Sequence, residues 1–281
     1  MYRTYLLSFI SLLLVAIACN EVFEPWQEND RYHFSIYGML DATADTQWVR
    51  VMPVREELFL DPRPIDVTVT LEHIESGETT IMHDSLFSYH PDVYAWNFWT
   101  TMELIPEETY RLTASHPDGR TSYGETTLPP DFPTPVVQTR AAPIVVHIEG
   151  VERLVDTQVI FHGQYPRTGE IRILGLPYLE DTLRTATGGY QVFINPAKHR
   201  NKLVGFPPTL KIVIYVASGG PDYYPFGTMK GREMETPQGI SNIRSGTGYL
   251  GGIVSKTVPY RSCYAEDGFR LVPCPLDPSP W

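Results

Sequence analysis

The chain has 281 residues, of which 42% are hydrophobic and 12% aromatic, and it carries a net charge of −11 at pH 7. At ~100 to 200 residues per domain, this length predicts two domains. The negative balance excludes partners such as nucleic acid, which a protein binds through a strong positive field that neither half of this chain carries.

The first nineteen residues predict export and a lipid anchor. Arg3 supplies a positive charge, and residues 6–17 form an apolar run. At ~1.5 Å per residue this run spans about 18 Å, too little for a bilayer core of ~30 Å, so residues 1–18 are expected to be a signal peptide. Cys19 follows directly after Ala-Ile-Ala, which resembles the lipobox of bacterial lipoproteins and implies cleavage before Cys19 and its acylation. An ordinary secreted protein whose first Cys falls at this point is the alternative.

Charge divides the mature chain. Residues 19–133 hold 21 Asp and Glu against 6 Arg and no Lys, whereas residues 134–281 hold 15 Lys and Arg against 12 acids. A step of this size indicates a domain boundary. Residues 19–27 are acidic and lack periodicity, as expected of a tether between lipid and fold.

The first domain, residues 28–133, is predicted to be an immunoglobulin-like or fibronectin type III-like β-sandwich. Residues 66–74 alternate with period two and are followed by a turn and a return strand over 79–83. Tyr110, in the sequence LIPEETYRLTA, is similar to the tyrosine corner of such sandwiches, where the hydroxyl bonds to backbone a few residues upstream.

The second domain, residues 134–281, is predicted to be β-rich with one short helix. A proline-dense linker precedes it, and the run 210–217 predicts a central strand that is covered on both faces. The short helix is expected at 221–229. The segment 239–254 holds five glycines, which suit either a bulged strand or a nest of amides for an anion.

Cys263 and Cys274 remain as an even pair once Cys19 is assigned to the lipid. In an exported chain this pair predicts a disulfide, worth ~2 to 3 kcal/mol in the chain-entropy model. Neither Cys has a CxxC partner or a nearby His, so zinc is not expected there.

The sequence lacks the common catalytic and metal-binding signatures, so we expect neither an enzyme nor a cofactor. The chain lacks GxSxG, SxxK, HExxH and an EF-hand loop. Two His and Glu pairs, His73 with Glu75 and His147 with Glu149, each supply two ligands where a metal site needs three or four. The abundant carboxylates favour a solvated acidic face over a pair spaced for glycoside hydrolysis.

Aromatic residues crowd the segment 87–99, which includes Trp96 and Trp99. Because strand side chains alternate, these two indoles are expected on opposite faces. One would pack into the core, and Trp99 would be left for a domain interface or for stacking on a sugar or peptide. The basic run 198–202 is expected to be a solvated loop, with contact to membrane phosphates or the acidic domain as the alternative.

Taken together, these features resemble a bacteroidete-type family of outer-membrane lipoproteins of unknown function. The resemblance rests on the lipobox, the sandwich, a short helix with Tyr223 and Tyr224, and Asn-Ile-x-x-Gly-x-Gly at 242–248. It implies an accessory or ligand-capturing role beside outer-membrane receptors for nutrient import, and it brings no catalytic residue. Tyr223 and Tyr224 join Trp96 and Trp99 as candidate ligand or interface residues.

The sequence therefore predicts a lipid-anchored outer-membrane or cell-surface lipoprotein that binds a ligand or an outer-membrane transporter without catalysis. A surface hydrolase acting on glycan or peptide is one alternative. A structural or adhesive surface protein is the other.

Overall fold

The computed structural model describes residues 32–54, 64–90, 93–139, 143–223, 241–260, 262–264 and 271–273. The predicted signal peptide, Cys19 and the tether lie outside these residues, as does most of the helix expected at 221–229. Within the described residues the fold is all-β, as predicted. None of the helical segments among them has the length and hydropathy of a membrane span.

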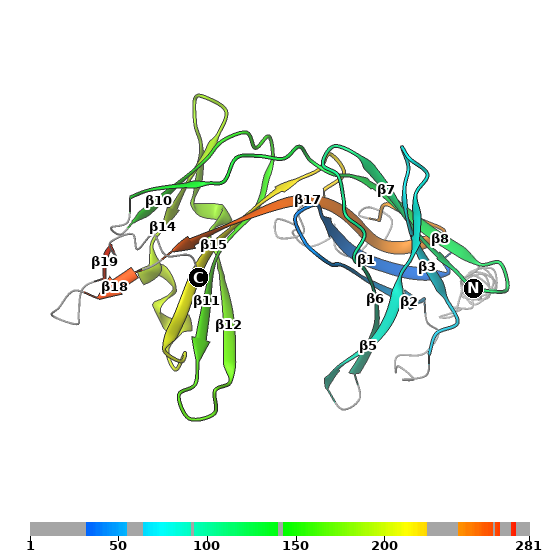
Figure 1. Ribbon diagram of the computed structural model, residues 1–281, viewed down its shortest axis with the longest axis horizontal. Helices are drawn as coiled ribbons and strands as arrows, with labels where there is room; N and C mark the ends of the chain where they lie inside the picture. The colour runs from blue at the N-terminus through cyan, green and yellow to red at the C-terminus, as the bar shows by residue number, and fades with distance from the viewer. Residues whose placement is uncertain are drawn as a thin grey trace, which may run out of the picture. The chain divides into compact units, whose positions relative to one another are not determined.

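One eight-stranded sheet takes strands from both predicted domains. Its order is β12 (Ile171–Pro177), β11 (Leu154–Gln164), β15 (Thr209–Gly219), β17 (Gly246–Tyr260), β1 (Phe34–Asp41), β2 (Gln47–Pro53), β6 (Val93–Thr100) and β5 (His83–His90). Strand β17 (orange in Figure 1) runs beside β1 toward one end and beside β15 toward the other. It pairs parallel with β1 and antiparallel with β15, so the two predicted domains share a sheet. The boundary expected at 133/134 itself stays a prediction.

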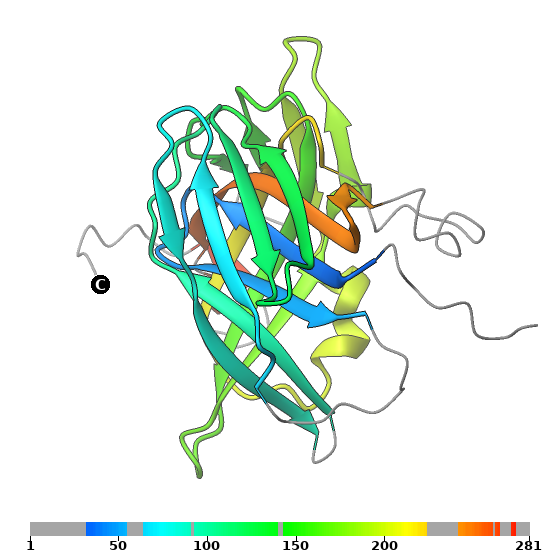
Figure 2. The ribbon, with the colours of Figure 1, turned by 90° about the vertical axis from the view of Figure 1, so that its right-hand side faces the viewer.

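Two smaller sheets accompany the large one. The five-stranded sheet has the order β16 (Ile243–Arg244), β8 (Thr121–Thr127), β7 (Thr109–Ser115), β3 (Thr68–His73) and β4 (Thr79–Ile81). The four-stranded sheet has the order β13 (Thr182–Arg184), β14 (Tyr190–Ile194), β10 (Ile144–Ile148) and β9 (Val136–Thr139). In Figure 2 the green strands β7 and β8 lie in front of the blue strands β1 and β2. A short pair, β18 (Ser262–Tyr264) with β19 (Leu271–Pro273), and two 3-10 segments, η1 (Leu179–Asp181) and η2 (Pro196–Leu203), complete the described elements.

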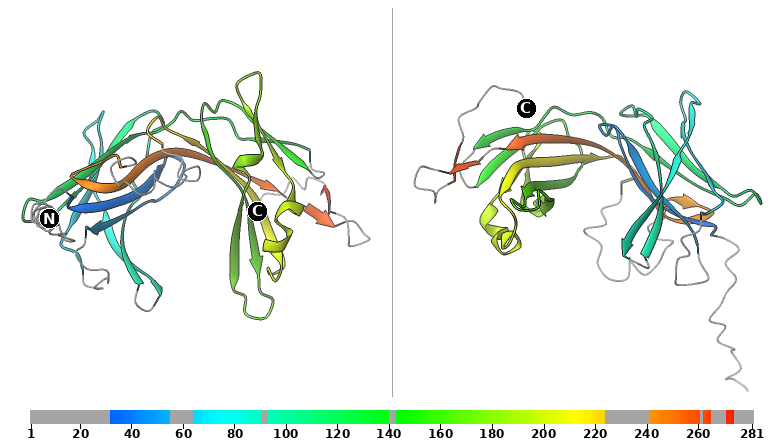
Figure 3. Two further views of the ribbon diagram at one scale, coloured as in Figure 1. Left: turned by 180° about the vertical axis from the view of Figure 1, so that it is seen from behind. Right: turned by 60° about the horizontal axis from the view of Figure 1, so that its bottom comes forward.

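Alternation along β17 places two hydrophobic cores on the same face of the large sheet. Figure 3 shows the course of β17 (orange) through this sheet in two further views. Leu250 packs into a core formed with the five-stranded sheet, where Ile36 and Leu112 are fully buried. Val254, four residues on, packs into a core formed with the four-stranded sheet, where Ile148 is fully buried. Because strand side chains alternate with period two, Leu250 and Val254 share a face. We call the opposite face of the eight-stranded sheet the outer face.

The tyrosine corner predicted in the first sandwich is confirmed. Tyr110 is 1% exposed, and its hydroxyl accepts a hydrogen bond from the N–H of Ile105 at 2.8 Å. The ring closes the end of the core while the hydroxyl satisfies a backbone donor five residues upstream.

The described part of the glycine-rich segment, residues 241–254, lies mainly in strands β16 and β17, which favours the strand alternative over an anion nest. The Asn242 side chain binds both backbone groups of Leu250, accepting from its N–H at 2.9 Å and donating to its carbonyl at 2.7 Å. Gly248 has a φ of 109°, and a Cβ there would collide with the carbonyl oxygen of Ile36 on β1. Glycine at this position therefore permits the close parallel approach of β1 and β17. The Asn-Ile-x-x-Gly-x-Gly pattern thus has a structural explanation.

Candidate functional site: an aromatic row on the outer face

Three ring side chains form one row across the outer face at the edge of the large sheet. Trp48 on β2 lies directly opposite Trp99 on β6, which in turn lies opposite His83 on the edge strand β5. The ring centroids of Trp48 and Trp99 are 6.0 Å apart, and those of Trp99 and His83 are 4.7 Å apart. We call Trp48, Trp99 and His83 the aromatic row.

The aromatic row is accessible and is extended by a fourth ring. Trp48 is 42% exposed, and its ring centroid lies 5.3 Å from that of Phe87, which is 38% exposed. These exposed rings are already ordered by their mutual contacts. Binding of a ligand or partner over them would therefore cost little conformational entropy.

A row of polar side chains adjoins the aromatic row, two residues away on each of the same three strands. Arg50 on β2 lies opposite Asn97 on β6, which lies opposite Ser85 on β5. Arg50 is exposed, Ser85 is half-buried, and Asn97 is 7% exposed, with its amide nitrogen donating to the Ala95 carbonyl at 3.1 Å. The surface therefore combines flat apolar groups with hydrogen-bonding groups, which is the composition of small-molecule sites and of interface hot spots.

The two tryptophans singled out from the sequence separate as alternation predicts. Trp99 joins the aromatic row, whereas Trp96 is 7% exposed and belongs to the core beneath the five-stranded sheet. Trp96 therefore leaves the set of candidate contact residues. Trp48 and His83 were missed, because nothing in a single sequence gives the register between β2, β6 and β5.

Tyr223 lies elsewhere on the outer face and is half-buried. Its ring meets that of Tyr249 edge-on at 6.4 Å, and the Arg153 guanidinium lies 5.8 Å from its centroid. Burial raises the pKa of Tyr223, and the nearby Asp156 adds to this. The ring contacts of Tyr223 are therefore with Tyr249 and Arg153 rather than with the aromatic row, and Tyr224 lies outside the described residues.

Asp156 is a half-buried carboxyl on β11 near Tyr223. Burial raises its pKa, and a hydrogen bond from the Gln158 amide at 2.6 Å opposes that rise. Among the described residues it has no ion pair with Lys or Arg. The group therefore costs free energy when it is ionised.

The basic run expected as a solvated loop over 198–202 lies instead in the 3-10 segment η2. The Asn195 side chain accepts a hydrogen bond from the Ala197 N–H and starts the turn, with Pro196 next in the chain. The Lys198 ammonium pairs with Asp181 at 2.6 Å, a residue of the same predicted domain. Neither the membrane contact nor the contact with the acidic domain is tested by this arrangement.

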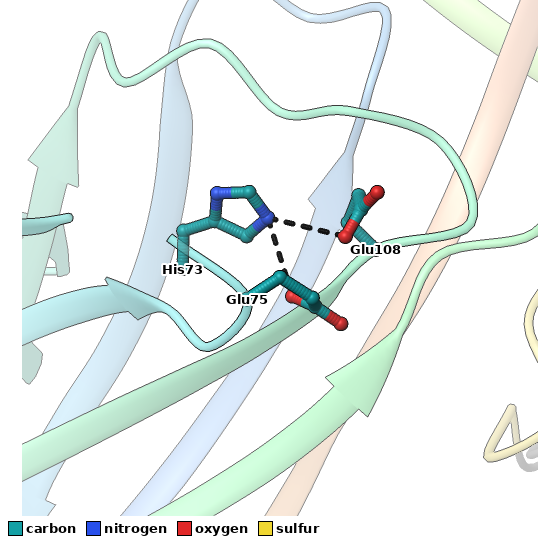
Figure 4. Close-up of side chains that lie close together, drawn as sticks. All are labelled: His73, Glu75 and Glu108. Atoms are coloured by element: carbon teal, nitrogen blue, oxygen red, sulfur yellow. Dashed lines mark hydrogen bonds and ion pairs between the residues drawn. The ribbon is translucent and has the colours of Figure 1, made fainter. Parts of the chain in front are cut away.

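A second cluster of functional groups lies at the end of the first sandwich. His73 Nε2 is 3.2 Å from Glu75 Oε2 and 3.4 Å from Glu108 Oε2 (Figure 4). Burial acts to raise the pKa of Glu75, but hydrogen bonds from its own backbone N–H and from Thr109, together with the nearby His73, hold this pKa below its usual value. The sequence identified only His73 and Glu75 as a pair of candidate ligands. The fold brings Glu108, which follows Leu-Ile-Pro-Glu at 104–107, next to this pair.

The second His and Glu pair predicted from the sequence, His147 with Glu149, gains no third candidate ligand among the described residues. His147 Nε2 lies 3.0 Å from Glu149 Oε1.

The predicted disulfide is untested, because nothing is described of the Cys263 side chain in β18 and Cys274 lies outside the described residues.

Comparisons with known proteins add little to this geometry. No protein-family profile matches the chain, and no curated protein sequence matches it. Among solved structures, a pullulanase from Anoxybacillus sp. LM18-11 matches at 10% identity with a TM-score of 0.23. The match covers 66% of this chain and 23% of that chain, so the chain spans about a quarter of that enzyme's length. A similarity this low carries no argument about fold or function.

Proposed function

We propose that this chain is a lipid-anchored outer-membrane or cell-surface lipoprotein with a non-enzymatic role, and that it binds an outer-membrane nutrient transporter through the aromatic row. The single observation that carries the proposal is the row itself, with Trp48 42% exposed and in tilted contact with the rings of Trp99 and Phe87. Tryptophan and arginine are the residues most enriched at interface hot spots, and Arg50 adjoins the row. The lipobox-like sequence at Cys19 and the resemblance to outer-membrane lipoproteins supply the location and the kind of partner.

A lipid anchor would help a binding protein by raising the effective concentration of a partner in the same membrane, without any catalytic step. Acyl chains on Cys19 would contribute ~0.8 kcal/mol for each buried methylene, so two or more chains would anchor the protein stably at the membrane. A partner in the same membrane then meets the row at a high local concentration, and a modest intrinsic affinity is enough.

The anchor is tested by changing Cys19→Ala in the full chain and following its partition between detergent and aqueous phases. The variant should move to the aqueous phase and should lose incorporation of labelled fatty acid. Unchanged partition and an unchanged membrane fraction would contradict the anchor.

The partner is tested by affinity purification of the full chain from detergent-solubilised membranes, followed by peptide mass spectrometry. The wild-type chain should retain a nutrient transporter, and the double variant Trp48→Ala, Trp99→Ala should lose it. Tyr123→Ala is the matched control, because Tyr123 is an exposed aromatic, at 37%, on the five-stranded sheet. Equal recovery in the double variant would overturn the role of the row.

The hydrolase alternative is separated by a panel of glycans and peptides incubated with the purified full chain. We expect no turnover. Hydrolysis that one carboxylate substitution abolishes would replace the proposed function.

A further inference from the structure

We propose that His73, Glu75 and Glu108 form a binding site for one divalent cation of the zinc type. The three side chains come from the end of β3, the β3–β4 turn and the residue just before β7, and each offers one ligand atom. These ligand atoms all lie within 4.8 Å of one another. The proposal is independent of the role assigned to the aromatic row.

The spacing fits a four-coordinate centre. Zinc binds histidine nitrogen and carboxylate oxygen at ~2.0 to 2.2 Å, so two ligands of a tetrahedral site lie about 3.3 to 3.6 Å apart. His73 Nε2 lies 3.2 Å from Glu75 Oε2 and 3.4 Å from Glu108 Oε2, so both of these ligand-to-ligand distances are close to that range. A cation can therefore take its place among the three atoms with small movements of two carboxylates, and water can complete the fourth position.

The imidazole is oriented for this role. His73 is 7% exposed, because the alternation of β3 turns it to the inner face, and its ring stacks on that of Tyr110 at 4.9 Å. The Ser76 hydroxyl hydrogen-bonds Nδ1 at 2.8 Å. With Nδ1 engaged, Nε2 is the nitrogen that faces both carboxylates (Figure 4), which is the outer-shell arrangement that orients histidine ligands in metal sites.

Charge and access both favour a cation. In the described part of the chain neither Glu75 nor Glu108 has an ion pair with Lys or Arg, and His73 is the basic group between them. The side chains of Glu75 and Glu108 are 43% and 34% exposed, so an ion reaches the cluster from solvent. The surrounding segment, residues 19–133, holds 21 acidic residues against 6 Arg. The competing explanation is an ion-pair cluster in which a protonated His73 replaces the metal.

The experiment titrates metal-free full chain in detergent with ZnCl2 in a calorimeter and with CoCl2 in a visible spectrophotometer. The wild-type chain should bind one equivalent of zinc, and cobalt should give the absorption of a four-coordinate site. Glu108→Gln and His73→Gln should each weaken zinc binding at least about tenfold, and Ser76→Ala should weaken it by about tenfold through loss of ring orientation. Far-UV circular dichroism verifies that each variant is folded.

Glu149→Gln is the matched control, because it alters the other His and Glu pair and should leave the affinity and the spectrum unchanged. Zinc binding that persists at full strength in folded Glu108→Gln would place the metal elsewhere, for example at cysteine, and would overturn the proposal. Absence of zinc binding to the wild-type chain, with a lower melting temperature in Glu108→Gln, would establish the ion-pair cluster instead.

Discussion

Replacement of Trp96 with alanine should destabilise the fold far more than replacement of Trp48, which lies on the outer face. Trp96 is 7% exposed and packs in the core beneath the five-stranded sheet. A buried tryptophan removes ~150 to 250 Å² from water, which at ~25 cal/mol per Å² corresponds to about 4 to 6 kcal/mol. This is an upper estimate, since the unfolded chain already buries part of that surface. With the ~3 to 5 kcal/mol observed for Trp→Ala in cores, we expect a loss of about 4 kcal/mol.

The assay is urea unfolding of the full chain in detergent, followed by circular dichroism so that loss of the indole does not alter the signal. Trp48→Ala is the comparison, because Trp48 is 42% exposed and its removal leaves no cavity. Its expected cost is about 1 kcal/mol, the value of one aromatic pair. Equal losses in the two variants, or a larger loss in Trp48→Ala, would refute the assignment of these indoles to opposite faces.

Three further changes probe the backbone and the buried polar groups. Gly248→Ala should lower the free energy of unfolding by at least about 1 kcal/mol, because a Cβ at φ 109° would collide with the Ile36 carbonyl oxygen. Urea titration measures this loss, and an unchanged midpoint of unfolding would contradict the close approach of β1 and β17. Tyr110→Phe should cost about 1 kcal/mol by leaving the Ile105 N–H without its partner, and a thermal melt as stable as wild type would contradict the tyrosine corner. Asp156→Asn should raise the melting temperature at pH 7, because burial raises the pKa of this carboxyl and ionisation therefore destabilises the fold. That gain should shrink as the pH falls and vanish below the ordinary pKa of 3.8, where both states are protonated, and a gain independent of pH would refute the explanation.

The sequence predicts local β structure well, because period-two alternation and turn residues are local signals. The strand around Val69 and Leu71, the hairpin that follows it and the corner at Tyr110 all lie where these signals place them. The sharing of one sheet between the two predicted domains was not predictable. Pairing of β1 with β17 joins residues more than 200 positions apart, and no periodicity in either segment encodes that contact.

The candidate site was likewise predictable only in part from the sequence. Alternation alone places Trp96 and Trp99 on opposite faces. The partners of Trp99 depend on strand register, which is set by packing across β2, β6 and β5, so Trp48 and His83 could not be predicted. Glu108 joins His73 for the same reason, since the β3–β7 pairing brings the two ends of the cluster together.

The most direct test of the proposed binding role is site-specific photo-crosslinking in intact cells. The photo-crosslinking amino acid benzoylphenylalanine replaces Trp99 in one strain and Tyr123 in another, and the crosslinked products are identified by mass spectrometry. We expect position 99 to crosslink to an outer-membrane nutrient transporter and position 123 to give no such product. A transporter product of equal yield at both positions, or products at position 99 that contain only copies of this chain or matrix components, would contradict it.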